Sequence, residues 1–154
     1  MSLFALSDTH LSLSTDKPMD IFGSRWQQHD KRISEAWTET VGDGDTVVIA
    51  GDISWAMSMD DALTDLAYLD RLPGRKLIGR GNHDYWWGTV NKMKKFFVEQ
   101  HGLSTLEFLY NNAFEVGEFI VCGSRGWWGG EGLCPSGVDY GKIVAREALR
   151  VGLS

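Results

Sequence analysis

Residues 46–52 of the 154-residue chain read TVVIAGD, an apolar run that stops at a glycine and an aspartate. The first four of these residues, Thr46 to Ile49, are all β-branched. Such a run is typical of a strand that is buried on both faces, as the strands of a parallel sheet are. Gly51-Asp52 therefore marks the place where a predicted strand ends and a loop begins.

Two other short apolar runs end in the same way. Leu3 to Leu6 runs into Ser7-Asp8-Thr9-His10, and Lys76 to Ile78 runs into Gly81-Asn82-His83-Asp84. Helical patterns separate the three runs, so that strands and helices alternate along the chain. This alternation predicts βαβ units and a parallel sheet, and hence an α/β fold.

The rest of the chain completes one compact unit, because it contains no repeat and no linker. Ser58 is the predicted N-cap of the second helix, with Asp60 and Asp61 in its first turn. We expect helices over residues 25–41, 58–72, 85–100 and 139–149, short strands over residues 106–110, 113–116 and 119–122, and a glycine-rich loop over residues 123–137.

Composition argues against several classes of protein. Hydrophobic residues make up 43% of the chain and charged residues 23%, as in ordinary soluble domains. The formal net charge of −6 gives no general attraction to nucleic acids or anionic membranes. The sequence shows no signal peptide and no apolar run of about 18 residues, and its two cysteines make no disulfide framework. We therefore expect a cytoplasmic protein.

Side chains that can bind metal ions follow all three predicted strands. Asp8 and His10 come after the first, Asp52 after the second, and Asn82 after the third. Taken singly, Asp and Asn also suit turns and helix caps. Because the carboxyl ends of parallel strands meet at one edge of a sheet, we expect all four side chains there. Carboxylate, imidazole and amide ligands suit two divalent ions such as Mn, Fe or Zn, which one carboxylate can bridge when they lie about 3.5–4 Å apart.

The motifs Asp-x-His, Gly-Asp and Gly-Asn-His-Asp, in this order and each after a strand, resemble the signature of the calcineurin-like metallophosphoesterase family. The match covers residues 3–84, and Ser124 to Trp127 (SRGW) resembles a smaller bacterial branch of predicted phosphohydrolases. The resemblance implies the calcineurin-like metallophosphatase fold, a four-layer α/β/β/α sandwich. It also implies a metal-dependent phosphatase or phosphodiesterase that acts on a phosphorylated small molecule or another phosphoester.

The resemblance assigns roles to the metal-binding residues. Asp8 and His10 would bind the first ion, Asn82 the second, and Asp52 would bridge both. A hydroxide held between the two ions would then attack phosphorus, because shared coordination lowers the pKa of water.

Two catalytic residues are also implied by the resemblance. His83 would stabilise or protonate the departing oxygen, and Asp84 would accept a hydrogen bond from His83 and so fix its tautomer. Arg125 follows a predicted strand and enters the glycine-rich loop, so we predict that it contacts the substrate phosphate, with Arg80 as a second candidate.

Tryptophans are numerous near these motifs. They either form a wall of the substrate pocket or pack in the core, and packing is our expectation for most of them. The residues concerned are Trp55, Trp86, Trp87, Trp127 and Trp128.

The family pattern contains further histidines near its end, the last in a Gly-His-x-His motif. This chain has four histidines and none after His101. His29 and His101 have polar neighbours, so we expect both on helix surfaces. We interpret residues 1–154 as a single domain that lacks the last strands of the second sheet and their histidine ligands. A naturally short variant and ligands supplied by another chain are the alternatives.

A rival function follows from the same shortage of histidines. The chain would then be a catalytically incomplete scaffold or regulatory domain that keeps the fold and at most one weakly bound metal ion. Metal stoichiometry and hydrolysis distinguish the two.

Overall fold

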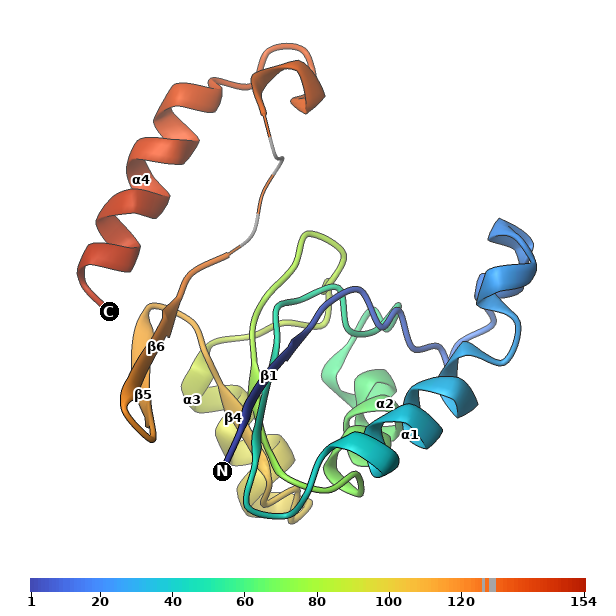
Figure 1. The fold of residues 1–154 in the computed structure, drawn as a ribbon. Helices are drawn as coiled ribbons and strands as arrows, with labels where there is room; N and C mark the ends of the chain where they lie inside the picture. Colours follow the sequence, from blue (N-terminus) through green and yellow to red (C-terminus); the bar gives the residue numbers. More distant parts are fainter. Residues whose placement is uncertain (126, 128–129) are drawn as a thin grey trace.

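The computed structural model describes residues 1–125, 127 and 130–154. Strands and helices alternate over its first two thirds, and a hairpin and a long helix follow (Figure 1). The main elements are β1 (Leu3–Leu6), α1 (His29–Thr40), β2 (Thr46–Ile49), α2 (Met59–Asp70), β3 (Arg75–Ile78), α3 (Val90–Met93), β4 (Leu106–Phe108), β5 (Asn112–Val116), β6 (Phe119–Gly123) and α4 (Tyr140–Gly152). Shorter helical segments are η1 (Met19–Phe22), η2 (Ser24–Trp26), η3 (Lys94–Gln100), which extends α3 as a π-helix, and η4 (Glu131–Leu133).

The parallel sheet predicted from the sequence is confirmed. Its four strands lie in the order β1-β2-β3-β4, and every neighbouring pair is parallel. The last residues of the strands are level with one another, because Ile49 lies opposite both Leu6 and Ile78, and Ile78 lies opposite Phe108. The loops that follow β1, β2 and β3 therefore open at one edge of the sheet, here called the carboxyl edge.

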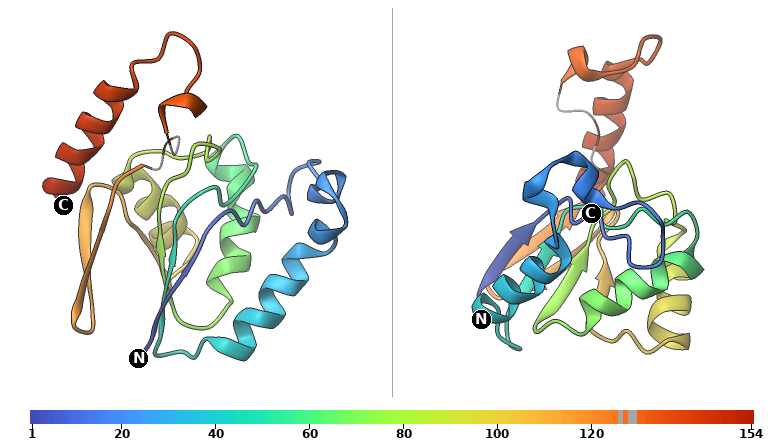
Figure 2. Two further views of the ribbon diagram at one scale, coloured as in Figure 1. Left: turned by 45° about the horizontal axis from the view of Figure 1, so that its top comes forward. Right: turned by 90° about the vertical axis from the view of Figure 1, so that its right-hand side faces the viewer.

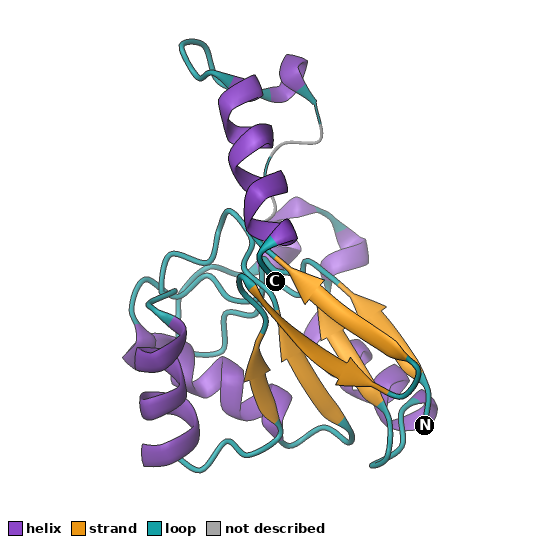
Figure 3. Cartoon of the chain, turned by 90° about the vertical axis from the view of Figure 1, so that its left-hand side faces the viewer, coloured by secondary structure: helices purple, strands orange, loops and turns teal. Residues whose placement is uncertain are grey.

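Side chains alternate between the two faces of the sheet, and each face has its own core. On one face Val47 and Ile49 pack against the helices, in a cluster that includes Leu66 of α2. On the other face Val48 and Leu77 pack with residues of the two-stranded antiparallel sheet β5-β6. The hairpin and the pair α1 and α2 thus lie on opposite sides of the parallel sheet (Figures 2 and 3).

The layers agree with the predicted fold class. Helices, a parallel sheet and a small second sheet are stacked in this order, which is consistent with the calcineurin-like metallophosphatase fold, and the second sheet consists of β5 and β6. Helix α4 has no buried residue and stands off from the sheets in Figure 1. Among the described residues, no helix is long and apolar enough to cross a membrane.

Helix boundaries follow local backbone chemistry. Ser58 caps α2 as predicted, because its side chain accepts a hydrogen bond from the amide of Asp61. Helix α1 begins at His29, later than predicted, because Gln28 adopts a left-handed backbone with φ of 48°. The third helix also begins late, at Val90, where the side chain of Thr89 caps it.

Candidate metal centre

Asp8, His10 and Asp52 converge at the carboxyl edge. One ligand atom from each lies within 4.8 Å of the other two, and His10 Nε2 is 3.5 Å from Asp8 Oδ1. Asp8 and His10 leave the end of β1, whereas Asp52 leaves the end of the neighbouring strand β2. The level strand ends described above bring the three side chains together.

The backbone at these three residues is left-handed. The φ angle is 56° at Asp8, 42° at His10 and 52° at Asp52. This conformation costs on the order of 1–3 kcal/mol for a residue with a Cβ, and such strain tends to collect at functional sites. In the described part of the chain only Gln28 and Asn111 share it among residues other than glycine.

Hydrogen bonds between the first two loops hold this strained backbone. The amide of Asp8 donates to the carbonyl of Gly51 at 3.0 Å, and the amide of His10 donates to the carbonyl of Asp52 at 3.0 Å. One residue further on, Leu11 donates to Ile53 at 2.8 Å. The first two loops therefore extend the parallel pairing of β1 and β2 beyond the strands.

The third loop closes on the second through two glycines. A Cβ on Gly81 would overlap the carboxylate and backbone of Asp52, and a Cβ on Gly51 would overlap the backbone of Arg80 and Gly81. The close approach lets the amide of His83 donate to Asp52 Oδ1 at 2.8 Å. Glycine is thus required at both positions because a side chain at either one would push the two loops apart.

Asp84 differs from its predicted role. We expected its carboxylate to accept a hydrogen bond from the His83 ring, but it accepts from the amides of Asp52, Ile53 and Gly81 at 2.8–2.9 Å, from the Trp86 indole at 3.1 Å, and more weakly from the amide of Ser54. Asp84 is 1% exposed. Its carboxylate therefore joins the second and third loops through hydrogen bonds to amides of both.

His83 lies beside His10. The two ring centroids are 5.8 Å apart, and the His83 ring is half-buried. The Nδ1 atoms of both rings are buried and have no hydrogen-bond partner among the described residues. Burial lowers the pKa of His10, against the carboxylates of Asp52 and Asp8, and so favours the neutral imidazole that metal ions bind.

Asn82 lies in the same loop, between the glycine that contacts Asp52 and His83. Its side chain is exposed. The position is compatible with a second metal ion at the carboxyl edge, and the assignment of Asn82 as its ligand remains a prediction.

Trp55 contacts both imidazoles. Its ring stacks on His10 with centroids 4.9 Å apart and planes 21° apart, and it lies 4.9 Å from the His83 ring. The indole N–H donates to the sulfur of Met19 at 3.1 Å, and the Lys17 ammonium lies 5.0 Å from the ring centroid. Trp55 thus lines the site, a role that the sequence left open between pocket wall and core.

The remaining predictions for tryptophans and histidines are confirmed in part. Trp86 and Trp87 are buried in the core, as expected, and Trp128 lies outside the described residues. His101 is exposed, as expected, but it follows η3 as the C-cap residue and does not lie within the helix. His29 differs, because its Nε2 lies 3.1 Å from the carbonyl oxygen of Thr9 and so supports the loop after β1.

Arg80 and Arg125 lie on the β4 and β6 side of the carboxyl edge. Both are half-buried, and their Nε atoms are buried without a hydrogen-bond partner among the described residues. Arg80 lies 6.0 Å from the Tyr110 ring centroid, and Arg125 lies 4.0 Å from that of Trp127. The predicted contact of Arg125 with a substrate phosphate is untested by these distances.

Comparisons with known proteins agree with this geometry. The family model described as calcineurin-like phosphoesterase matches residues 1–144. Gene 66 protein of Mycobacterium phage L5 is 41% identical over 58 residues, and that of Mycobacterium phage D29 is 45% identical over 56 residues. These matches cover 38% and 36% of this chain and 28% of each phage protein.

A solved structure shares the fold. The protein of unknown function AQ665 from Aquifex aeolicus aligns with a TM-score of 0.56 and 19% sequence identity. The alignment covers 97% of this chain and 74% of that chain. At this level of identity the likeness concerns the fold alone.

Proposed function

The chain belongs to the calcineurin-like phosphoesterase family, and from this premise we propose that it hydrolyses phosphoesters with two divalent metal ions bound at the carboxyl edge. The observation that carries the proposal is the convergence of Asp8, His10 and Asp52, whose ligand atoms lie within 4.8 Å of one another. Carboxylate and imidazole ligands suit Mn, Fe or Zn.

The site fits metal ions in two further ways. The Nε2 atom of His10 lies 3.5 Å from Asp8 Oδ1, a separation at which one metal ion can bind both atoms. The left-handed backbone at all three ligands directs them to a common point at a cost in stability, as binding sites do.

Each residue has a distinct part in the proposed centre. Asp8 and His10 would hold one ion, Asn82 would hold the other, and Asp52, with two carboxylate oxygens, would contact both. When bound, the ions supply Lewis acidity toward the phosphoryl oxygens and make a water molecule more acidic.

His83 is the proposed proton donor. Asp52 holds its backbone amide, and its ring lies beside His10 with Nδ1 unpartnered among the described residues. An imidazole in this position can donate a proton to the departing oxygen, which typically accelerates such reactions 10²–10⁴-fold. Asp84 would act as a positioning residue that fixes the loop carrying His83.

Metal stoichiometry and hydrolysis test the proposal together. The protein is dialysed against Mn²⁺ or Zn²⁺, its metal content is measured by mass spectrometry, and p-nitrophenyl phosphate and its diester are offered as substrates. Two ions per chain and turnover are expected. One weakly held ion and no turnover would support the rival scaffold, because three converging ligand atoms are enough to hold a single ion.

A matched pair of histidine variants tests the proton donor. His83→Ala should lower turnover about 10²–10⁴-fold while both ions stay bound. His101→Ala, at an exposed histidine outside the site, should leave turnover unchanged. Loss of bound metal in His83→Ala would instead assign His83 to the ligand set.

A further inference from the structure

Arg80 and Arg125 approach each other from different elements. Arg80 lies in the loop after β3, two residues before Asn82, and Arg125 lies two residues after β6. The amide of Asn111 donates to the carbonyl of Gly123 at 2.7 Å, which joins the end of β6 to the segment that carries Tyr110. Arg80 lies over the Tyr110 ring, so both guanidinium groups flank this segment.

The same end of the molecule carries the candidate metal centre. In Figure 1, β6 ends on the side where β1, β2 and β3 also end. The loop after β3 itself connects the two places, because Gly81 and His83 hold Asp52 and Arg80 precedes them. The arginine pair therefore borders the metal centre.

Neither arginine forms an ion pair among the described residues, and the carboxylate nearest to Arg125 is that of Glu147, which lines the same pocket. In the part of the chain that the structure describes, the Nε atom of each arginine is buried without a hydrogen-bond acceptor. The carboxylate of Glu147, in α4, accepts hydrogen bonds from Arg146 and Arg150. Burial first, and then the charge of Arg80, lower the pKa of Arg125 against the opposing effects of Tyr110 and Glu147, which agrees with two neighbouring cations that the Glu147 carboxylate compensates only in part.

This arrangement is costly unless an anion binds. Two like charges taken partly out of water repel each other, and buried N–H groups without acceptors lose their hydration. A guanidinium group presents parallel N–H donors that match the oxygens of a phosphate group. An aromatic ring lies against each guanidinium group, Tyr110 against Arg80 and Trp127 against Arg125. Tyr110 is itself packed against Trp87.

We propose that Arg80 and Arg125 form an anion subsite beside the metal centre, and that the substrate is a phosphoester carrying a second phosphate or similar anionic group. The second group would bind at the arginine pair while the ester to be cleaved lies at the metal centre. The existence of the subsite stands on the arginine geometry, whereas its use in selecting a substrate rests on the proposed function.

Binding to the metal-free protein tests the subsite by itself. Methylenediphosphonate, which is not hydrolysed, is titrated calorimetrically into the chelator-treated chain. We expect binding that weakens about 10–100-fold in Arg125→Gln and in Arg80→Gln, as loss of a charge-assisted contact does. Arg71→Gln is the matched control, because Arg71 is exposed at the opposite edge of the sheet and should not affect binding. Equal binding by all variants, or none by the wild type, overturns the subsite.

Hydrolysis rates test whether the anion subsite takes part in selecting the substrate. Alkanediol bisphosphates of increasing chain length are compared with the matching alkyl monophosphates in the metal-loaded protein. At a suitable length the bisphosphate should have a kcat/KM about 10–100-fold higher, and Arg125→Gln should lower kcat/KM much more for the bisphosphate than for the monophosphate. An equal loss for both substrates would overturn the assignment. If no substrate is turned over but binding still depends on the arginines, the proposed function fails and the anion subsite stands.

Discussion

At the amino end of the parallel sheet, Lys76 is fully buried and its ammonium is satisfied. It donates to the carbonyls of Leu72 and Asp70 and to the hydroxyl of Thr105. At the carboxyl edge, by contrast, His10 and His83 each keep a buried ring nitrogen without a partner in the described part of the chain.

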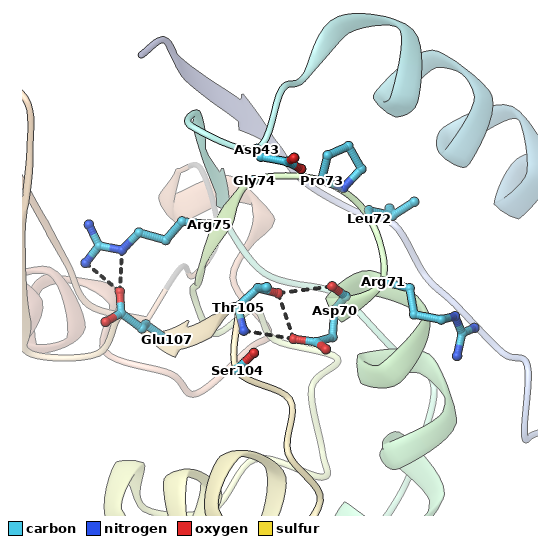
Figure 4. Close-up of a pocket in the computed structure, with 10 residues that line it drawn as sticks. All are labelled: Asp43, Asp70, Arg71, Leu72, Pro73, Gly74, Arg75, Ser104, Thr105 and Glu107. Atoms are coloured by element: carbon cyan, nitrogen blue, oxygen red, sulfur yellow. Dashed lines mark hydrogen bonds and ion pairs between the residues drawn. The ribbon is translucent and has the colours of Figure 1, made fainter.

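The surroundings of Lys76 continue the same pattern. Asp70 accepts from the amide and the hydroxyl of Thr105, and Arg75 pairs with Glu107 (Figure 4). These residues line a surface pocket, but Arg75 and Glu107 already bind each other and the Asp70 carboxylate already binds Thr105. The amino end therefore uses buried polar groups for stability, whereas the carboxyl edge leaves donors and acceptors available for a ligand.

Asp52→Asn should give the largest difference between an effect on turnover and an effect on stability. The change removes the proposed bridging carboxylate and should lower turnover by at least about 10³-fold, with loss of tight metal binding. The free energy of unfolding of the metal-free protein should change by less than about 1 kcal/mol, because Asn tolerates the left-handed backbone and still accepts the His83 amide. Metal content, phosphatase assay and urea denaturation measure these effects.

Asp70→Asn is the matched variant at the amino end. It weakens the contacts with Thr105 and should cost about 1–2 kcal/mol of unfolding free energy, with turnover unchanged. If Asp52→Asn and Asp70→Asn changed the free energy of unfolding and turnover in the same proportion, the contrast between the two edges would fail.

Asp84→Asn should show that one buried carboxylate at the carboxyl edge contributes to stability, as the buried polar groups at the amino end do. Asn offers a single oxygen to N–H groups that now share two, and its own NH₂ group would face some of them. We expect the free energy of unfolding to fall by about 3–5 kcal/mol, because the second and third loops would separate. Turnover should be lost as well, because the third loop carries His83. Glu107→Gln, at a partly exposed ion pair, should cost less than about 1 kcal/mol.

The burial of Lys76 should appear as a pH dependence of stability. Burial lowers its pKa from 10.5 to about 8, so the unfolded chain binds the proton more tightly than the folded chain does. The free energy of unfolding should therefore rise as the pH increases from 8 to 10.5, by about 3 kcal/mol, and stay level with respect to this group below pH 8. Urea denaturation at several pH values measures the rise.

Lys76→Met isolates this contribution. The variant cannot titrate at position 76, so the difference between its pH profile and that of the wild type removes the effect of tyrosines and cysteines that titrate in the same range. Parallel profiles for the two proteins would show that Lys76 keeps an ordinary pKa in the folded chain.

The fold and the place of the site could be predicted because both follow from local pattern. The β-branched run Thr46–Ile49 predicts a buried parallel strand, and Gly51-Asp52 marks its end. Once three strands end in this way, parallel pairing alone brings Asp8, His10 and Asp52 to one edge.

The remaining features depend on contacts between distant loops, which no local pattern encodes. The sequence could not show that Asp84 would accept amides of residues 52 and 53, because this requires the distance between two loops. It also gave no reason to expect a fully buried ammonium at Lys76, since lysine usually lies on the surface. The Arg80 and Arg125 pair likewise depends on how β6 meets the segment after β4.

Trp55→Leu should have the smallest effect and tests whether an aromatic ring at the carboxyl edge serves the site. Trp55 stacks on His10 and contacts His83, so its loss should let both imidazoles rotate and lower kcat about 10-fold, with both metal ions retained. Trp37→Leu is the control, because Trp37 is buried in α1 and donates to the Pro73 carbonyl near the amino end. That variant should lose about 2–4 kcal/mol of unfolding free energy with kcat unchanged at a temperature where it is folded. If Trp55→Leu lost stability and kept its kcat, Trp55 would belong with the core tryptophans, and the contrast between the two edges would stop at the metal ligands.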